Sequence, residues 1–236
     1  MWYHTPVLQI VRDVYDFHTH TFLSDGELSP IELIRRAVVN GYKAIAVTDH
    51  AGLNDQQRIL QVLVRECDVA TREMGILAIP GVELTHVPPH LIDEAARQAR
   101  SLGARIVIVH GETVKEPVAP GTNRAALSSA YVDVLAHPGM LSEQDAALAR
   151  QRGIFLELTA RRGHSITNGL VARTALLAGA AMVVDSDAHA PDDLLTAELS
   201  TTVALGAGLT RDQALGTLQA NPMSLVEKLR NRVPLV

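Results

Sequence analysis

The chain has 236 residues, and 47% of them are hydrophobic but only 3% are aromatic, so Val, Ile, Leu and Ala must build the core. A formal net charge of −5 argues against a nucleic-acid-binding surface, and no apolar run reaches the roughly 18 residues of a membrane span. The single cysteine, Cys67, excludes an internal disulfide, and the N-terminus does not resemble a signal peptide. We therefore expect a cytoplasmic protein that requires neither nucleic acid nor a membrane, with its oligomeric state left open.

Seven short apolar runs recur along the chain every 22 to 33 residues, which is the spacing of β/α units. The predicted strands are residues 14–18, 43–48, 76–82, 105–109, 132–136, 154–158 and 181–185. Regular strand–helix alternation predicts a mainly parallel sheet, and seven units suit a closed or nearly closed barrel better than an open sheet. Because no linker or charge block interrupts the pattern, we expect residues 1–236 to form a single domain.

Helix signals fill the intervals between the predicted strands. Ser29 to Glu32 forms a capping box with proline at the first helical position, and Gly41 ends that helix. Further helices are predicted over residues 55–74, 89–102, 142–152 and 168–177, after a second capping box at 210–213, and from 221 to about 230. The longest irregular stretch, residues 112–123, is predicted to be a loop over a site.

Two short motifs near opposite ends of the chain each carry two metal-type ligands one residue apart. The sequence DFHTH ends the first predicted strand with His18 and His20, and DSDAH follows the last with Asp187 and His189. Residues i and i+2 of a strand point to the same side, so each motif aims two side chains at one place. If the chain ends meet in the fold, the two pairs converge on a metal.

The other predicted strands end in the same way. Six of the ten histidines lie at or just beyond a strand end, where the active sites of β/α barrels are found. Together with three carboxylates they make nine candidate donors, namely His18, His20, Asp25, His50, Glu83, His110, His137, Asp187 and His189. Nine donors exceed the needs of one tetrahedral ion, which indicates two or three ions that share a bridging carboxylate.

In this order, the motifs HTH, SDG, TDH, GVE, AHP and SDAH resemble those of the PHP family, named for polymerase and histidinol phosphatase. The resemblance covers nearly the whole chain. It implies a distorted seven-stranded β/α barrel with a two- or three-metal site that hydrolyses phosphate esters. Zn, Mn and Fe all suit mixed imidazole and carboxylate donors, so the metal stays open.

The resemblance assigns the nine donors to three metal positions. These are His18, His20, Glu83 and Asp187 for one ion, Glu83, His110 and His137 for a second, and Asp25, His50 and His189 for a third. Asp49 is expected either to orient a ligand or to cap a helix.

The expected activity is hydrolysis of a small phosphate monoester, such as a histidinol phosphate-like, sugar or nucleotide phosphate. A bridging water that loses its proton would attack phosphorus, with Glu83 and Asp187 as central catalytic carboxylates. Arg161 is the best candidate for a phosphate clamp, because a guanidinium grips two oxygens at once. Weaker candidates for substrate contact or leaving-group protonation are His86, Lys115, Arg124, Arg162 and His164, whereas His4 and His90 are expected at the surface.

Two alternatives stay open. Related barrels with similar ligands hydrolyse amides or lactones, and that activity would not depend on Arg161. The chain could also be a noncatalytic, metal-stabilised accessory PHP domain, although no ligand position is lost. Metal uptake without turnover of any phosphate ester would favour the accessory domain.

Overall fold

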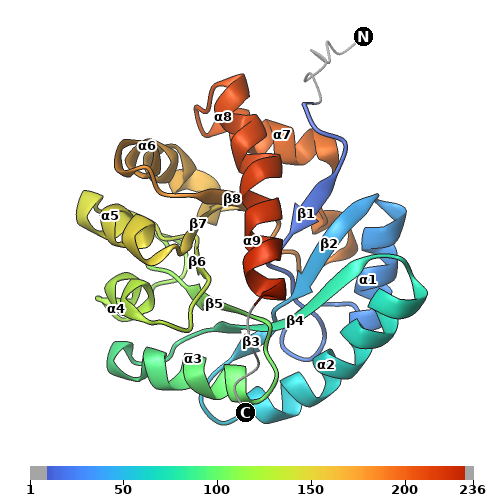
Figure 1. Cartoon of the computed structure of the whole chain (residues 1–236). Coiled ribbons are helices and arrows are strands. Elements are labelled where there is room, and N and C mark those ends of the chain that lie inside the picture. The colour runs from blue at the N-terminus through green and yellow to red at the C-terminus, as the bar shows by residue number, and fades with distance from the viewer. Residues whose placement is uncertain (1–9, 232–236) are drawn as a thin grey trace.

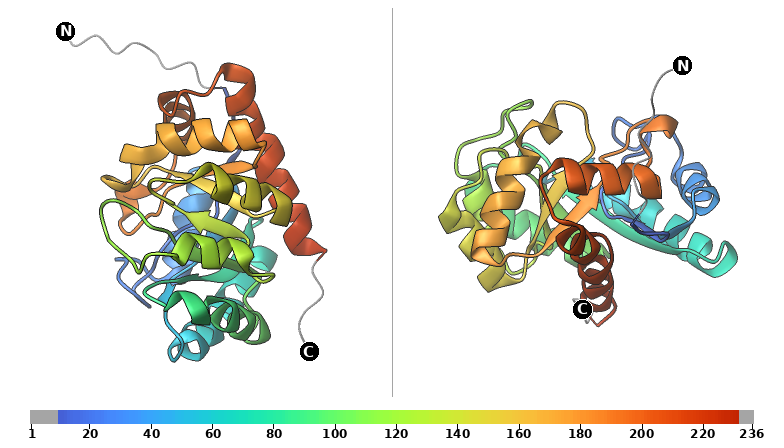
Figure 2. Two further views of the ribbon diagram at one scale, coloured as in Figure 1. Left: turned by 90° about the vertical axis from the view of Figure 1, so that its left-hand side faces the viewer. Right: turned by 90° about the horizontal axis from the view of Figure 1, so that it is seen from above.

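The structure is a computed structural model that describes residues 10–231, so His4 lies outside the described residues. In this range, parallel strands form a nearly closed barrel surrounded by helices (Figure 1; Figure 2). The strands of the barrel pair in the order β1 (Val14–Asp16), β2 (Tyr42–Val47), β4 (Leu77–Leu84), β5 (Ile106–His110), β6 (Val134–Ala136), β7 (Phe155–Thr159) and β8 (Met182–Asp185). A two-residue strand, β3 (His50–Ala51), pairs with the end of β4. The predicted α/β barrel is confirmed.

The helices follow the strands along the chain. They are α1 (Pro30–Val39), α2 (Gln56–Glu73), α3 (Ile92–Ser101), α4 (Thr122–Ser128), α5 (Glu143–Arg152), α6 (Asn168–Ala178), α7 (Ala197–Gly206), α8 (Arg211–Leu215) and α9 (Asn221–Arg230). Among residues 10–231, no helix is both long enough and apolar enough to cross a membrane. Cys67 is buried in α2, as expected for a core residue.

The predicted helix caps are formed in part. The Ser29 hydroxyl accepts a hydrogen bond from the Glu32 backbone N–H at 3.3 Å, but the Glu32 carboxylate pairs with Arg35 at 2.7 Å instead of returning to the cap. The first capping box is therefore only half made. The second is complete, because Thr210 and Gln213 each bond the other's backbone N–H.

The last helix begins earlier than predicted. The pair at 221–222 does not open a new helix, because α8 runs through a π-helical turn over residues 216–220 directly into α9. Pro222 lacks an N–H, and its ring clashes with a regular helical turn, so the widened turn accommodates it. The Asn221 amide donates to the Met182 carbonyl at 2.8 Å and ties the joint to β8. Helices α4 and α7 were not predicted from the sequence.

The barrel interior forms a small apolar core beneath the strand ends. Phe17, Ile108 and Phe155 belong to it, and Leu225 and Leu229 of α9 pack against it from below. Figure 1 shows α9 crossing the middle of the barrel. A larger apolar cluster fills the layer between the strands and the outer helices. The interior is therefore closed at the N-terminal end of the strands, and the polar groups lie at the other end.

The barrel closes between β1 and β8 at the C-terminal ends of these strands. No regular ladder joins them, but the Asp187 N–H donates to the His18 carbonyl at 2.9 Å and the His20 N–H donates to the Ala188 carbonyl at 2.8 Å. The Phe17 N–H donates to the Asp185 carboxylate at 2.6 Å. The two motifs that were predicted to meet thus lie side by side.

Candidate metal centre

All nine predicted donors gather at the C-terminal end of the barrel. Each belongs to at least one group of three or four residues whose ligand atoms lie within 4.8 Å of one another. These groups are His20, Asp25, His50 and His189; His18, Glu83 and His137; His18, His20 and Asp187; His50, Glu83 and His110; and His137, His164 and Asp187. The geometry therefore allows more than one ion.

Glu83, at the end of β4, lies at the centre of the cluster and is fully buried. Its Oε2 atom is 3.2 Å from His18 Nε2 and 2.7 Å from His50 Nδ1, and its Oε1 atom is 3.1 Å from His110 Nδ1 and 3.4 Å from His137 Nε2. Burial would raise the pKa of this carboxyl, but the surrounding imidazolium charges outweigh burial and hold the pKa well below its usual value. The position suits a carboxylate that bridges two cations.

Asp25 organises a second group at the edge of the cluster. Its Oδ2 atom lies 3.2 Å from His189 Nε2 and 3.6 Å from His50 Nε2, and its Oδ1 atom lies 4.0 Å from His20 Nδ1. The Asp25 side chain is 55% exposed, whereas the carboxylates of Glu83 and Asp187 are buried. This group therefore lies at the solvent side of the centre.

Unpaired polar atoms show that the donor set fits metal ions. Six donor atoms are buried and form no hydrogen bond of good geometry among the described residues, namely His18 Nε2, both ring nitrogens of His20, Glu83 Oε2, His110 Nε2 and His137 Nδ1; some of them only lie close to another donor of the cluster. A buried polar atom without a hydrogen bond destabilises the folded protein by about 1–3 kcal/mol, so six such atoms in one place would be strongly destabilising without a ligand. Divalent ions coordinated by these imidazoles and carboxylates would satisfy them.

Two of the donors hold unusual backbone conformations. Asp187 has φ 54° and His137 has φ 25°, values that cost side-chain-bearing residues about 1–3 kcal/mol each. A hydrogen bond from the backbone N–H holds each of them. The Asp187 N–H donates to the His18 carbonyl, and the His137 N–H donates to a Glu157 carboxylate oxygen at 2.6 Å. Such strain is typical of side chains that the fold forces into a functional position.

Glu157 lies in β7, is fully buried, and was not among the residues predicted for the site. One carboxylate oxygen accepts the Nδ1–H of His18 at 2.8 Å, and the other accepts the backbone N–H of His137. The first bond fixes the tautomer of His18, because its Nδ1 must carry the proton and its Nε2 is left free to bind a metal. The only sequence signal was a lone glutamate within an apolar strand.

Asp49 holds the loop that presents Asp25. Its carboxylate accepts hydrogen bonds from the N–H and hydroxyl of Thr21 and from the N–H and hydroxyl of Ser24, at 2.7–3.1 Å. It does not cap α2, whose N-cap is residue 55. Gly26 completes the loop, because a Cβ there would lie 2.5 Å from the His20 carbonyl oxygen. Asp49 therefore orients the loop rather than a ligand directly.

Two buried aspartates join the motifs beneath the centre. Asp16 accepts from the Ser186 N–H at 3.0 Å and from the Tyr42 hydroxyl at 3.1 Å, and Asp185 accepts from Phe17. Burial raises the pKa of Asp16 to about 6, and burial with the nearby Asp16 charge raises the pKa of Asp185 well above its usual value. These carboxylates join β1 to β8, and neither belongs to a group of candidate metal donors among the described residues.

The predicted substrate residues line two cavities beside the donor cluster. A cavity of about 480 Å³ is lined by Lys115, Arg161, Arg162 and His164, and Arg161 makes an ion pair with Asp193 at 3.1 Å. Another cavity, of about 510 Å³, contains Asp25 and His50 together with His86 and Arg58. Glu116, from the loop predicted to cover the site, lines both cavities. Arg124 instead pairs with Asp145 at 2.7 Å and lines neither cavity, so the structure does not bring it to the other predicted substrate residues.

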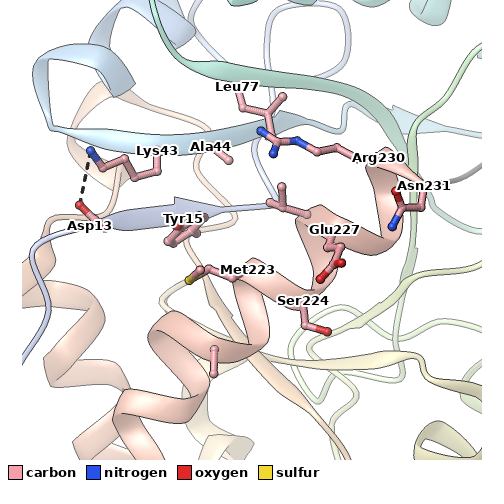
Figure 3. A pocket seen from close by; sticks show the side chains of 12 residues that line it. Asp13, Tyr15, Lys43, Ala44, Leu77, Met223, Ser224, Glu227, Arg230 and Asn231 are labelled. Atoms are coloured by element: carbon pink, nitrogen blue, oxygen red, sulfur yellow. Dashed lines mark ion pairs between the residues drawn. The ribbon is translucent and has the colours of Figure 1, made fainter.

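A third cavity, of about 920 Å³, lies at the opposite end of the barrel. It is bordered by the first residues of β1, β2 and β4 and by one face of α9, with Lys43, Tyr15, Met223 and Arg230 among its lining (Figure 3). The Lys43 ammonium is paired with Asp13 at 3.6 Å. None of the predicted site residues lines this cavity, so the donor cluster remains the candidate functional site.

Comparison with known proteins agrees with this arrangement. A model of the PHP domain matches residues 16–159. An uncharacterized protein of Methanocaldococcus jannaschii is 46% identical over 220 residues, which cover 91% of this chain and 99% of that protein. A probable phosphatase of Thermoanaerobacter is 27% identical over 226 residues, covering 86% of this chain and 90% of the relative.

Among solved structures, histidinol phosphate phosphatase of Lactococcus lactis, in complex with zinc, L-histidinol and phosphate, superposes with a TM-score of 0.58. It is 14% identical, and the match covers 84% of this chain and 94% of that structure, a likeness that shows the fold. The chain belongs to the PHP domain family, as the resemblance of its motifs predicted. It is a metal-dependent, phosphatase-like hydrolase.

Proposed function

We propose that the protein is a phosphoesterase that hydrolyses a small phosphate monoester with two or three divalent ions held by the nine donors. The observation that carries the proposal is the position of Glu83, whose two carboxylate oxygens face imidazoles of different donor groups. Such ions would neutralise phosphate charge and lower the pKa of bound water. The native metal remains within Zn, Mn and Fe on the basis of the donor types.

The chain's own residues position and protect this chemistry. Glu157 holds the ring of His18 and the backbone of His137, and Asp49 holds the loop with Asp25. The apolar barrel core, which includes Phe17, fills the barrel beneath the donor cluster, so the site opens toward the C-terminal ends of the strands. Catalytic polar groups therefore act in a partly dehydrated pocket, where their electrostatic interactions are stronger than in water.

The two flanking cavities support a small phosphorylated substrate. Their volumes of about 480 and 510 Å³ lie in the range of pockets that hold small molecules. Lys115 and Arg162 form no ion pair among the described residues, so both cations are available to an anionic substrate. His86 lines the other cavity, with its ring centroid 6.1 Å from that of His110, a position that suits its predicted role in protonating a leaving group. Histidinol phosphate-like, sugar and nucleotide phosphates all remain candidates, and a cytoplasmic location is part of the same proposal.

Metal-dependent turnover of phosphate esters tests the function. We expect protein stripped by a chelator to lose hydrolysis of p-nitrophenyl phosphate and to regain it on addition of Mn²⁺, Zn²⁺ or Fe²⁺. A panel of phosphate monoesters would then rank substrates by kcat/KM, with amides and lactones as the comparison. Metal uptake without turnover of any phosphate ester would contradict the proposal and favour an accessory domain.

Arg161→Ala should mainly raise KM for phosphorylated substrates, because the guanidinium lines the cavity beside the donor cluster. Its ion pair with Asp193 leaves it half-buried, and an incoming phosphate would compete for the same charge. We expect a KM increase of about tenfold, which corresponds to about 1.4 kcal/mol of binding. Arg124→Ala is the matched control, since Arg124 also pairs with an aspartate but lies outside both cavities. An equal effect on an uncharged ester would exclude the phosphate clamp.

A further inference from the structure

One buried histidine outside the nine donors faces the same cluster. His164 lies in the 3₁₀ turn His164–Thr167, between β7 and α6, and is 3% exposed. One of its ring nitrogens, one of His137 and one carboxylate oxygen of Asp187 all lie within 4.8 Å of one another. This is the same geometric relation that joins the nine donors, and His164 is the one additional residue that it brings in among residues 10–231.

The spacing of the rings is that of histidines placed to share an ion. The ring centroids of His164 and His137 are 4.5 Å apart. For comparison, His110 and His137, which face the same carboxylate of Glu83, are 4.4 Å apart. His20 and His50, both in the Asp25 group, are 4.2 Å apart. The distance between the rings of His164 and His137 thus matches the distances between predicted metal donors.

His164 also has a buried nitrogen without a partner. Its Nδ1 atom has no hydrogen bond and no solvent exposure, like the unpaired atoms of His18, His20 and His110. Its Nε2 atom lies 3.7 Å from the exposed carboxylate of Glu116, which is beyond hydrogen-bond distance. A buried imidazole that serves only to fill space would need a partner for its polar nitrogens, whereas a donor to a metal needs a free one.

The turn that carries His164 has an unusual backbone just before it. Gly163 has φ +91°, and a Cβ at this position would lie 3.2 Å from Cγ of Lys115. The aliphatic stem of Lys115 therefore packs directly on the Gly163 backbone and holds the turn against the loop over the site. His164 therefore lies between the donor cluster and the 480 Å³ cavity that it lines together with Lys115.

We propose that His164 is a tenth protein donor of the metal centre, binding an ion on the side where His137 and Asp187 face it. The proposal rests on the proposed function in one respect, namely that the nine donors hold ions. A neutral imidazole at this position would favour Zn²⁺, Mn²⁺ or Fe²⁺ over Mg²⁺, which prefers oxygen donors and water. With a ring nitrogen bound to an ion, His164 would not contact the substrate directly.

His164→Phe tests the proposal because phenylalanine keeps an aromatic ring against His137 but has no donor atom. Metal-free protein would be titrated with Zn²⁺ against a competing chelator, and bound metal per chain would be measured by elemental analysis. We expect the affinity of one ion to fall at least about tenfold. His90→Phe is the matched control, because His90 is exposed in the turn Pro89–Leu91 and should leave the titration unchanged.

The outcomes separate this inference from the proposed function. Unchanged zinc affinity and stoichiometry in a folded His164→Phe protein would overturn the inference, and a simultaneous loss of phosphate affinity would show that His164 binds substrate instead. Wild-type protein that binds no metal at all would overturn the proposed function as well. If the variant fails to fold, anomalous diffraction from zinc-loaded wild-type crystals decides: an ion about 2.0–2.1 Å from a His164 nitrogen supports the proposal, and a longer separation from every ion excludes it.

Discussion

Glu83→Gln should reduce kcat by at least about 10³-fold, which corresponds to about 4 kcal/mol of activation free energy. Glutamine has the shape of glutamate, so the packing at the end of β4 should be kept. The amide lacks the negative charge that faces four imidazoles at 2.7–3.4 Å. Without that negative charge, the repulsion between two neighbouring cations would not be compensated. We therefore expect the loss of at least one bound ion per chain.

Three measurements check this prediction. Elemental analysis gives bound metal per chain, steady-state kinetics give kcat at saturating metal, and thermal unfolding gives the stabilisation by added metal. A metal that binds only the folded protein raises its melting temperature, so this increase should shrink in the variant. Glu94→Gln on the exposed face of α3 makes the same chemical change away from the site. Unchanged metal content and rate in the Glu83 variant would remove the bridging role.

The donor cluster was predictable because its signal is local and repeated. A pair of ligands spaced i, i+2 at the end of a strand, as in His18 and His20, must point to one side whatever the rest of the fold does. Parallel strands in a barrel bring all their C-terminal ends together, so the same phase at strand after strand implies convergence. The sequence therefore predicted the barrel and which residues gather, although not which nitrogen of each ring faces which neighbour.

Interactions between distant residues were not predictable in this way. Asp193 lies 32 residues after Arg161, and nothing in either local sequence indicates that they pair. Asp49 had two equal interpretations, and only the loop around Thr21 and Ser24 decides between them. Pro222 was predicted to start a helix because proline is common at the first helical position. In the structure, a π-helical turn over residues 216–220 precedes it, and the helix continues through the proline.

Glu157 is the clearest case of a residue that only the structure reveals. It lies 139 residues from His18 in the sequence, and its strand shows no ligand pair. A single buried glutamate is costly unless its oxygens are satisfied, and here both are satisfied by groups of the metal centre. The strand that lacked a predicted donor thus contributes the group that orients two donors.

Glu157→Gln should therefore weaken metal binding by about 10–100-fold without removing any ligand. The two carboxylate oxygens accept from two N–H groups, at His18 and at His137, and an amide offers only one acceptor oxygen. If the amide nitrogen faces His18, the ring must move its proton to Nε2, the atom that faces Glu83 and Asp187 and has to be free for a metal. If it faces His137, a buried backbone N–H loses its acceptor, at about 1–3 kcal/mol.

The decisive readout is how the loss of activity depends on metal concentration. Because Glu157 touches no substrate position, kcat should recover to within about tenfold of wild type at saturating metal, whereas the Glu83 variant should not recover. Zinc titration against a chelator gives the affinities, and Glu94→Gln again serves as the control for the chemical change. An affinity equal to wild type would show that the fold alone orients His18 and His137. A kcat that stays low at saturating metal would instead place Glu157 in the reaction itself.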